Sequence, residues 1–238
     1  MSAKANVQAL LFDVFGTVVD WRTSIIDELT RFGAEKGLKV DWAAFTDDWR
    51  GLYQPAMEEV RAGRRAWTIL DVLHRESLEQ LLAKNGIAGL SDAEKDHINR
   101  VWHRLKPWPD VVAGLMRLKS QYIIGTLSNG NVGLLTRMAK NAGLPWDVVL
   151  GAETARAYKP LPAAYLASAA LLNLEPSQVM LVAAHNGDLA AAAETGLRTA
   201  FVARPTEYGP HQKLDFKAER DWDVVTDSFT GLADVMGC

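Results

Sequence analysis

The chain has 238 residues, of which 48% are hydrophobic and 23% charged, and its formal net charge is −3 at pH 7. These values are typical of a globular protein with a sizeable core and exclude the strongly basic character of many nucleic-acid-binding proteins. The single cysteine, Cys238, excludes an intrachain disulfide and argues against a cysteine-based metal cluster. No apolar stretch is long enough to span a bilayer, and the first six residues lack the apolar run of a signal peptide. We therefore expect a cytoplasmic protein without nucleic-acid or membrane partners.

The first half of the chain predicts one strand followed by helices. Residues 7–12 form a short apolar run that is typical of a buried parallel strand. From residue 21 to about residue 106, apolar residues recur at helical spacing. We predict helices there over residues 22–36, 42–53, 66–85 and 92–104. Ser91 and Glu94 have the spacing of a capping box at the start of the last helix.

After Pro109, which can start a helix over residues 110–120, strands and helices alternate. The predicted strands cover residues 122–127, 148–151, 179–184, 199–203 and 224–226. Predicted helices over residues 132–141, 162–172 and 189–195 lie between them. This alternation predicts an α/β fold with a doubly wound, Rossmann-like parallel sheet. Residues 1–20 and 108–238 would form the core, and residues 21–107 a helical cap inserted after the first strand.

Chemically reactive side chains stand at or after the ends of the predicted strands. Asp13 follows the first strand, Ser128 and Asn129 follow the second, Lys159 comes later in the chain, and Asp188 follows the fourth. Ligands of doubly wound sheets bind beyond the carboxyl ends of the strands, so these groups are expected to converge. Two buried carboxylates would repel each other, and Lys159 offers a cation to hold them together. Each residue alone is more often a turn or cap residue, but the whole set predicts one site.

The set resembles the four motifs of the haloacid dehalogenase superfamily and, within it, the L-2-haloacid dehalogenase group. Asp13 and Thr17 match the Asp-x-x-x-Thr motif after the first strand. Ser128, Lys159 and Asp188 match the second, third and fourth motifs. The resemblance covers nearly the whole chain, including the inserted cap, and implies that these five residues are catalytic.

Phe15 separates two activities within this superfamily. Its phosphatases carry a second aspartate at this position, which protonates the departing alkoxide as a general acid. Halide leaves without a proton, and Asp13-Val14-Phe15-Gly16-Thr17 is similar to the form found in dehalogenases. The fourth motif also has a single carboxylate, whereas phosphatases usually have more to hold magnesium. The resemblance implies a hydrolase that needs no metal or cofactor. It would convert small 2-haloalkanoic acids and water to 2-hydroxy acids through an ester on Asp13.

The resemblance also implies residues that bind substrate and halide. Arg50 matches an arginine that the cap contributes, Asn129 matches the asparagine of the second motif, and Tyr165 matches an aromatic residue of the family site. Ser128 and the backbone amides near Phe15 would bind the substrate carboxylate. Without the resemblance, Arg50 would be assigned to a solvated helix face, and Tyr165 is nearly as well explained by packing. Relatives are often dimers, so a homodimer is expected.

One segment departs from the family pattern. Many relatives have Ser-Ser-Asn-Ala-Trp-Asp where this chain has Ala183-Ala184-His185-Asn186-Gly187-Asp188. The Ala-His-Asn form is similar to that of a subgroup that includes enzymes acting on fluoroacetate, and His185 would then be an extra donor that helps fluoride to depart. The alternative is a loop histidine that bonds to the backbone. Gly187 in place of tryptophan predicts a more open pocket wall.

Two other functions share most of these residues. A magnesium-dependent phosphatase or phosphonatase of the same superfamily would share Asp13, Ser128, Lys159 and Asp188, and Phe15 is the residue that argues against it. A non-catalytic ligand-binding member is suggested by Ala183 and Gly187, which stand where many relatives have serine and tryptophan. The intact nucleophile and its partners make this second alternative the weaker one.

Overall fold

The computed structural model describes residues 6–238, so residues 1–5 of the expected core segment lie outside the described part. A six-stranded sheet has the order β5-β4-β1-β6-β7-β8, and every neighbouring pair is parallel. Its strands are β1 (Ala9–Phe12), β4 (Ile123–Ser128), β5 (Val148–Gly151), β6 (Val179–Ala183), β7 (Arg198–Val202) and β8 (Val224–Thr226). The predicted doubly wound α/β fold is confirmed, with β1 at the centre of the sheet.

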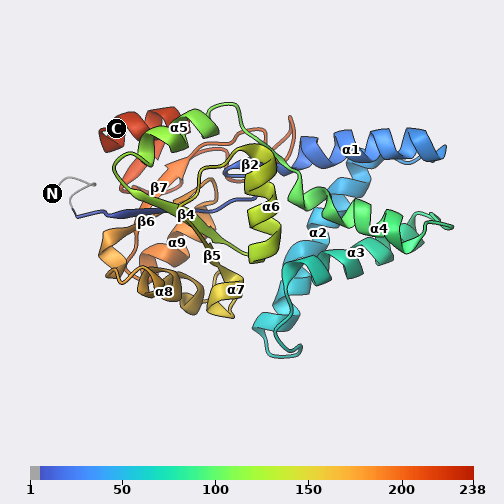
Figure 1. Cartoon of the computed structure of the whole chain (residues 1–238), viewed down its shortest axis with the longest axis horizontal. Helices are drawn as coiled ribbons and strands as arrows, with labels where there is room; N and C mark the ends of the chain where they lie inside the picture. Colours follow the sequence, from blue (N-terminus) through green and yellow to red (C-terminus); the bar gives the residue numbers. More distant parts are fainter. Residues whose placement is uncertain (1–5) are drawn as a thin grey trace.

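Side chains alternate along β1 between two apolar layers. Leu10 and Phe12 belong to one buried cluster, and Ala9 and Leu11 belong to the other. This follows from the twofold period of a strand, which points successive side chains to opposite faces. The first cluster takes in α5 (Val111–Leu118), α6 (Val132–Ala142) and α10 (Phe229–Met236), and the second takes in α8 (Pro162–Leu171) and α9 (Asn186–Glu194). Figure 1 shows α5 and α10 above the sheet and α8 and α9 below it.

The segment between β1 and β4 is helical. It contains α1 (Trp21–Lys36), α2 (Trp42–Arg61), α3 (Leu70–Lys84), α4 (Asp92–Asn99) and a 3₁₀ turn, η1 (Arg100–His103). The chain enters and leaves this segment through two short antiparallel strands, β2 (Val19–Asp20) and β3 (Lys106–Pro107). In Figure 1 the four helices lie to the right of the sheet, beyond the ends of the strands. A binding site at these strand ends is therefore walled by both parts of the chain.

Some helix boundaries were predicted wrongly. Helix α2 was expected to end at residue 53 but continues through Pro55 to Arg61. Tyr53 and Met57 lie one turn apart and are both buried, so the apolar face extends beyond the proline. The proline removes one backbone donor, but Gly51, whose carbonyl loses that bond, is exposed and can be hydrated. Helix α4 was expected to reach residue 104 but ends at Asn99, where the chain tightens into η1.

Other ends differ in ways that matter for the site. Helix α3 begins at Leu70 rather than at residue 66, because Ile69 before it is extended. Helix α9 begins at Asn186, so Asp188 lies in its first turn and not in the preceding loop.

The short helices α7 (Ala152–Ala155) and η2 (Pro176–Gln178) were not predicted. The capping box of Ser91 and Glu94 is confirmed. None of the helices in residues 6–238 is long and apolar enough to cross a membrane.

Candidate active site

Asp13 lies directly after β1, at the carboxyl edge of the sheet, and only 6% of it is exposed. Its Oδ1 accepts a hydrogen bond from Lys159 Nζ at 2.9 Å. Its Oδ2 accepts one from Thr17 Oγ1 at 2.7 Å and faces His185 Nδ1 at 3.1 Å. Burial alone would raise the pKa of Asp13, but the charges and hydrogen bonds of Lys159 and His185 outweigh it and hold that pKa well below its ordinary value. Asp13 is therefore an ionised carboxylate with a fixed orientation.

Lys159 bridges the two carboxylates of the site, as its position in the sequence suggested. Its Nζ lies 2.5 Å from Asp188 Oδ2 and 2.9 Å from Asp13 Oδ1. Burial lowers the pKa of Lys159, but the two carboxylates outweigh this effect and raise it above the ordinary value. The backbone N–H of Lys159 donates to Asn129 Oδ1 at 2.8 Å, and its carbonyl accepts from Arg61 Nη1 at 2.9 Å. The backbone of Lys159 is thus held by Asn129 on one side and by α2 on the other.

Tyr165 stands behind the pocket wall rather than on it. Its side chain is fully buried, and its hydroxyl donates to Asp188 Oδ1 at 2.6 Å. Lys159 holds the other oxygen of Asp188. Both oxygens of this carboxylate are therefore oriented, and Tyr165 acts on Asp188 instead of contacting a bound halide as the resemblance implied.

His185 lies between two carboxylates. Its Nδ1 faces Asp13, and its Nε2 is 2.9 Å from Glu207 Oε2. Ionised carboxylates only accept hydrogen bonds, so both ring nitrogens must donate and the ring is an imidazolium. Burial lowers the pKa of His185, but Glu207 and Asp13 raise it well above its ordinary value. The alternative of a loop histidine bonded to the backbone is wrong.

Glu207 was missed in the sequence. It lies in the loop after β7, is 1% exposed, and its Oε1 accepts from Trp21 Nε1 at 3.0 Å. Burial raises the pKa of Glu207, but His185 outweighs it and lowers that pKa below the ordinary value. Glu207 could have been considered because it lies in a loop that follows a parallel strand. It stands five residues beyond the end of that strand, however, and at that distance the position of the sheet edge does not predict which loop residue faces the site.

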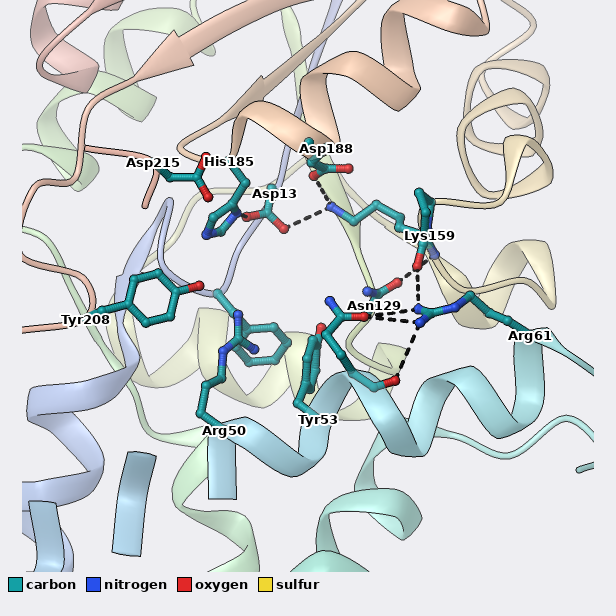
Figure 2. A pocket seen from close by; sticks show the side chains of 14 residues that line it. Asp13, Arg50, Tyr53, Arg61, Asn129, Lys159, His185, Asp188, Tyr208 and Asp215 are labelled. Atoms are coloured by element: carbon teal, nitrogen blue, oxygen red, sulfur yellow. Dashed lines mark hydrogen bonds and ion pairs between the residues drawn. The ribbon is translucent and has the colours of Figure 1, made fainter. Parts of the chain in front are cut away.

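The charged groups open onto a pocket of about 470 Å³. Its lining comprises Asp13, Phe15, Arg50, Tyr53, Gln54, Arg61, Asn129, Lys159, Pro160, His185, Gly187, Asp188, Tyr208 and Asp215. Figure 2 shows the lining residues of α2 facing the carboxylates and lysine of the core across this space. Arg50 and Gln54 stand one helical turn apart on α2 and both line the pocket. Because residues at this spacing share a helix face, the sequence could have predicted Gln54 as a lining residue once Arg50 was assigned to the site.

Arg50 is half-buried against aromatic rings and is not on a solvated helix face. Its guanidinium carbon lies 4.3 Å from the centroid of the Tyr53 ring and 5.2 Å from that of Trp21. Its Nη1 is buried and has no hydrogen-bond partner among the residues described. Burial lowers the pKa of Arg50, but Tyr208, Tyr53 and other nearby groups raise it by a larger amount. The pKa therefore lies above its ordinary value, and the side chain keeps its charge. An unpartnered buried donor beside the pocket suits an anion.

Phe15 forms an apolar wall where a phosphatase would have a general acid. It is 2% exposed and makes edge contacts with Tyr53 and Trp102, at centroid distances of 6.3 and 5.7 Å. No proton donor stands at this position.

Two further predicted residues, Thr17 and Ser128, lie behind the pocket surface. Thr17 Oγ1 donates to Asp13 and accepts from the backbone N–H of Ala184 at 2.9 Å. Ser128 is fully buried, and its Oγ accepts from Gly130 N at 3.1 Å. Ser128 is absent from the lining of the described pocket, so its predicted contact with the substrate carboxylate needs a change in the pocket wall.

The positive charge between the pocket carboxylates comes from a side chain. Within residues 6–238, no three His, Cys, Asp or Glu side chains are grouped so that they would hold a metal ion. Asp13 and Asp188 both direct an oxygen at the ammonium of Lys159. The two carboxylates and the ammonium therefore form an ion-paired cluster.

Comparison with known proteins agrees with this geometry. Residues 7–196 match the family of haloacid dehalogenase-like hydrolases. The chain belongs to this family. Among solved structures of haloacid dehalogenases, a defluorinating L-2-haloacid dehalogenase is 51% identical to it, with a TM-score of 0.96 over 98% of this chain and 96% of the other. A second L-2-haloacid dehalogenase is 48% identical, with a TM-score of 0.95 over 97% and 99%. The (S)-2-haloacid dehalogenase of Xanthobacter autotrophicus is 30% identical over 83% of this chain and 76% of its own length.

Proposed function

We propose that this hydrolase cleaves the carbon–halogen bond of small 2-haloalkanoic acids such as haloacetates and 2-halopropionates. The products are 2-hydroxy acids, and the intermediate is an ester on Asp13. The observation that carries the proposal is the pairing of an ionised, ammonium-bound Asp13 with an apolar Phe15 at the position of the phosphatase acid. The three similar proteins named above are all 2-haloacid dehalogenases, and their names support the same substrate class.

The first step is nucleophilic displacement at carbon. Asp13 attacks the carbon that bears the halogen, and halide leaves with the bonding electrons. Arg50 receives the developing halide charge through its unpartnered Nη1, with Asn129 on the opposite wall of the pocket. Phe15 and Tyr53 keep this region apolar, which strengthens the attraction between halide and guanidinium.

The second step is hydrolysis of the ester. Water attacks the Cγ of Asp13, and Asp188 accepts a proton from this water. Tyr165 and Lys159 orient the two oxygens of Asp188 for this task. Collapse of the tetrahedral intermediate breaks the bond between Cγ and the alkyl oxygen, and the 2-hydroxy acid leaves after that oxygen takes a proton. Lys159 supplies the local positive charge, so we propose that turnover needs no metal or cofactor.

The arrangement of the chain suits this chemistry. We propose that residues 21–107 form a cap on a core made of residues 1–20 and 108–238, and that Arg50 reaches the site from the cap. The paired strands β2 and β3 stand where the chain passes between the two parts. A cytoplasmic location stays a prediction from the sequence pattern, and a homodimer stays a prediction of the family resemblance.

Halide release tests the proposal directly. Purified protein is incubated with fluoroacetate, chloroacetate and 2-chloropropionate, with and without EDTA, and with an aryl phosphate plus magnesium in parallel. We expect halide release that EDTA does not reduce, and none from Asp13→Ala. Phosphate release without halide release would contradict the proposal and favour the phosphatase alternative. Halide release by Asp13→Ala would contradict the ester mechanism.

A further inference from the structure

The two oxygens of Asp13 have different surroundings. Lys159 Nζ is the single side-chain donor to Oδ1 within the described chain. Oδ2 has two side-chain donors on its side, Thr17 Oγ1 and His185 Nδ1. Figure 2 shows His185 and Lys159 on opposite sides of this carboxylate. An oxygen with two donors has fewer free lone pairs for attack, so Oδ1 is the better nucleophile and Oδ2 would become the carbonyl oxygen of the ester.

The hydroxyl of Thr17 is oriented by the backbone. Its Oγ1 accepts the N–H of Ala184 at 2.9 Å, so the proton of the hydroxyl points to Asp13 Oδ2 at 2.7 Å. Both distances are those of ordinary hydrogen bonds. This donor is therefore in place before any reaction begins.

The second donor, His185, is held by a buried carboxylate that the reaction described above does not use. Glu207 takes one hydrogen bond from His185 Nε2 and one from Trp21 Nε1, and it is 1% exposed. The chain makes room for it at Gly16, where a Cβ would stand 2.1 Å from Glu207 Oε1. Three separate segments of the chain thus converge to keep Glu207 against the imidazole.

We propose that Thr17 and His185 form an oxyanion site for Oδ2 of Asp13 during hydrolysis of the ester, and that Glu207 is the positioning residue that keeps His185 in this site. The inference rests on the proposed function, since it concerns the second step of that reaction. It gives His185 a task on the ester, which differs from assisting the departure of fluoride.

Charge movement distinguishes the two steps. During alkylation, Oδ1 forms a bond to the substrate carbon and negative charge moves away from Asp13 to the halide. The imidazolium of His185 gains nothing from that movement. During hydrolysis, the water oxygen bonds to Cγ, a water proton passes to Asp188, and the carbonyl π electrons move onto Oδ2. The two donors stabilise this new charge, which is the differential binding that accelerates a step.

The collapse of the tetrahedral intermediate accounts for the remaining electrons and protons. The electrons on Oδ2 re-form the carbonyl, the bond between Cγ and Oδ1 breaks, and the departing alkoxide takes the proton from Asp188. The carboxyl group of Asp13, which now carries the water oxygen, loses its proton to solvent. No oxidant, reductant or further reactant is needed.

The test measures the two steps separately in Glu207→Gln. A glutamine still accepts from Trp21, but its amide donates to His185 Nε2 and leaves the ring neutral. Chloroacetate is mixed with enzyme in a quench-flow instrument, and chloride release and the mass of the alkylated protein are followed. We expect alkylation within about threefold of the wild-type rate and decay of the adduct slowed by about 10²-fold, so that the ester accumulates to near one per active site.

Two further variants separate positioning from folding. Glu207→Asp keeps the negative charge and should restore part of the hydrolysis rate. Glu28→Gln is the matched control, because Glu28 is also a poorly exposed carboxylate bound to a cation, Arg104, but on α1 away from the pocket. It should leave both steps unchanged.

Two results would overturn the inference. Equal slowing of both steps in Glu207→Gln would indicate a structural role, and an unchanged decay of the adduct would remove Glu207 from the reaction. Wild-type protein that neither releases chloride nor forms an adduct would instead contradict the proposed function itself. Accumulation of the ester in Glu207→Gln alone supports the oxyanion site.

Discussion

The carboxylate of Glu207 occupies the space that a side chain on Gly16 would fill. A Cβ built on Gly16 would lie 2.1 Å from Glu207 Oε1 and 2.2 Å from its Cδ. The glycine also has a positive φ of 91°, which other residues rarely adopt. Gly16 therefore permits both the turn after Asp13 and the close approach of the loop that carries Glu207.

Gly16→Ala should be strongly destabilising. Its positive φ alone costs an alanine about 1–2 kcal/mol, and displacement of the buried carboxylate should add about 2 kcal/mol. The matched control is Gly37→Ala, since Gly37 has a φ of 66° but no atom within 4 Å of its Cβ position. Urea unfolding of both variants measures the difference. Equal losses of stability would show that Glu207 moves aside without cost.

Lys159→Met should move the acid limb of the pH–rate profile upward. In the wild type, Lys159 and His185 hold the pKa of Asp13 below its ordinary value of 3.8, so Asp13 stays ionised at any pH above about 4. Without the ammonium, burial raises that pKa, and a larger share of Asp13 is protonated and inactive as pH falls. We expect kcat/KM at neutral pH to fall by about 10²-fold or more, because the nucleophile also loses its orientation.

The measurement is kcat/KM for chloroacetate from pH 4.5 to 9 in both proteins. Lys159→Arg is the companion variant, because it keeps the charge and should keep the acid limb low even if the rate falls. A Lys159→Met profile with the wild-type shape would show that the lysine does not control ionisation of Asp13.

Arg50→Gln should slow the first step and spare the second. The buried guanidinium has a free Nη1 beside the pocket, and only departure of halide places a new anion there. Loss of one such donor is expected to slow alkylation by about 10²-fold, with decay of an already formed ester unchanged. Arg64→Gln serves as control, since Arg64 pairs with Glu59 on the surface. Unchanged alkylation in Arg50→Gln would remove Arg50 from the halide site.

Glu207→Gln should change the pH dependence of stability. The pKa of His185 is raised above 6.5 in the folded protein, so its contribution is complete below about pH 6.5 and is lost as pH rises through the folded-state value. The pKa of Glu207 is lowered below 4.5, so its contribution is complete above about pH 4.5 and is lost as pH falls through the folded-state value. The pair therefore stabilises most between about pH 4.5 and 6.5.

We expect the variant to be less stable by about 3 kcal/mol within that window, the cost of breaking a buried ion pair, and the deficit to shrink above it. Chemical unfolding of both proteins at pH 5.5, 7.5 and 9 provides the measurement. A deficit that is constant across this range would show that His185 does not gain its proton on folding.

Much of the fold and part of the site were accessible from local patterns. Apolar runs bounded by turns predicted each strand of the sheet, because a buried parallel strand needs apolar side chains on both faces. Asp13 and Asp188 were expected together because the carboxyl ends of parallel strands share one edge, and Lys159 was expected between them because like charges need a cation. Phe15 indicated the absence of a general acid because the family resemblance places it where phosphatases carry a second aspartate.

Tertiary structure decided which side chains complete the site. Trp21, Glu207 and His185 come from the start of α1, the loop after β7 and the N-cap of α9, and Trp21 and Glu207 are 186 positions apart. No periodicity links such residues, since their contact depends on how three segments pack. The same holds for Tyr165, which packing placed behind Asp188 instead of in the pocket. The sequence alone predicted the sheet, most of the helices and a set of candidate reacting groups, whereas packing determined which partners hold each group and in which charge state.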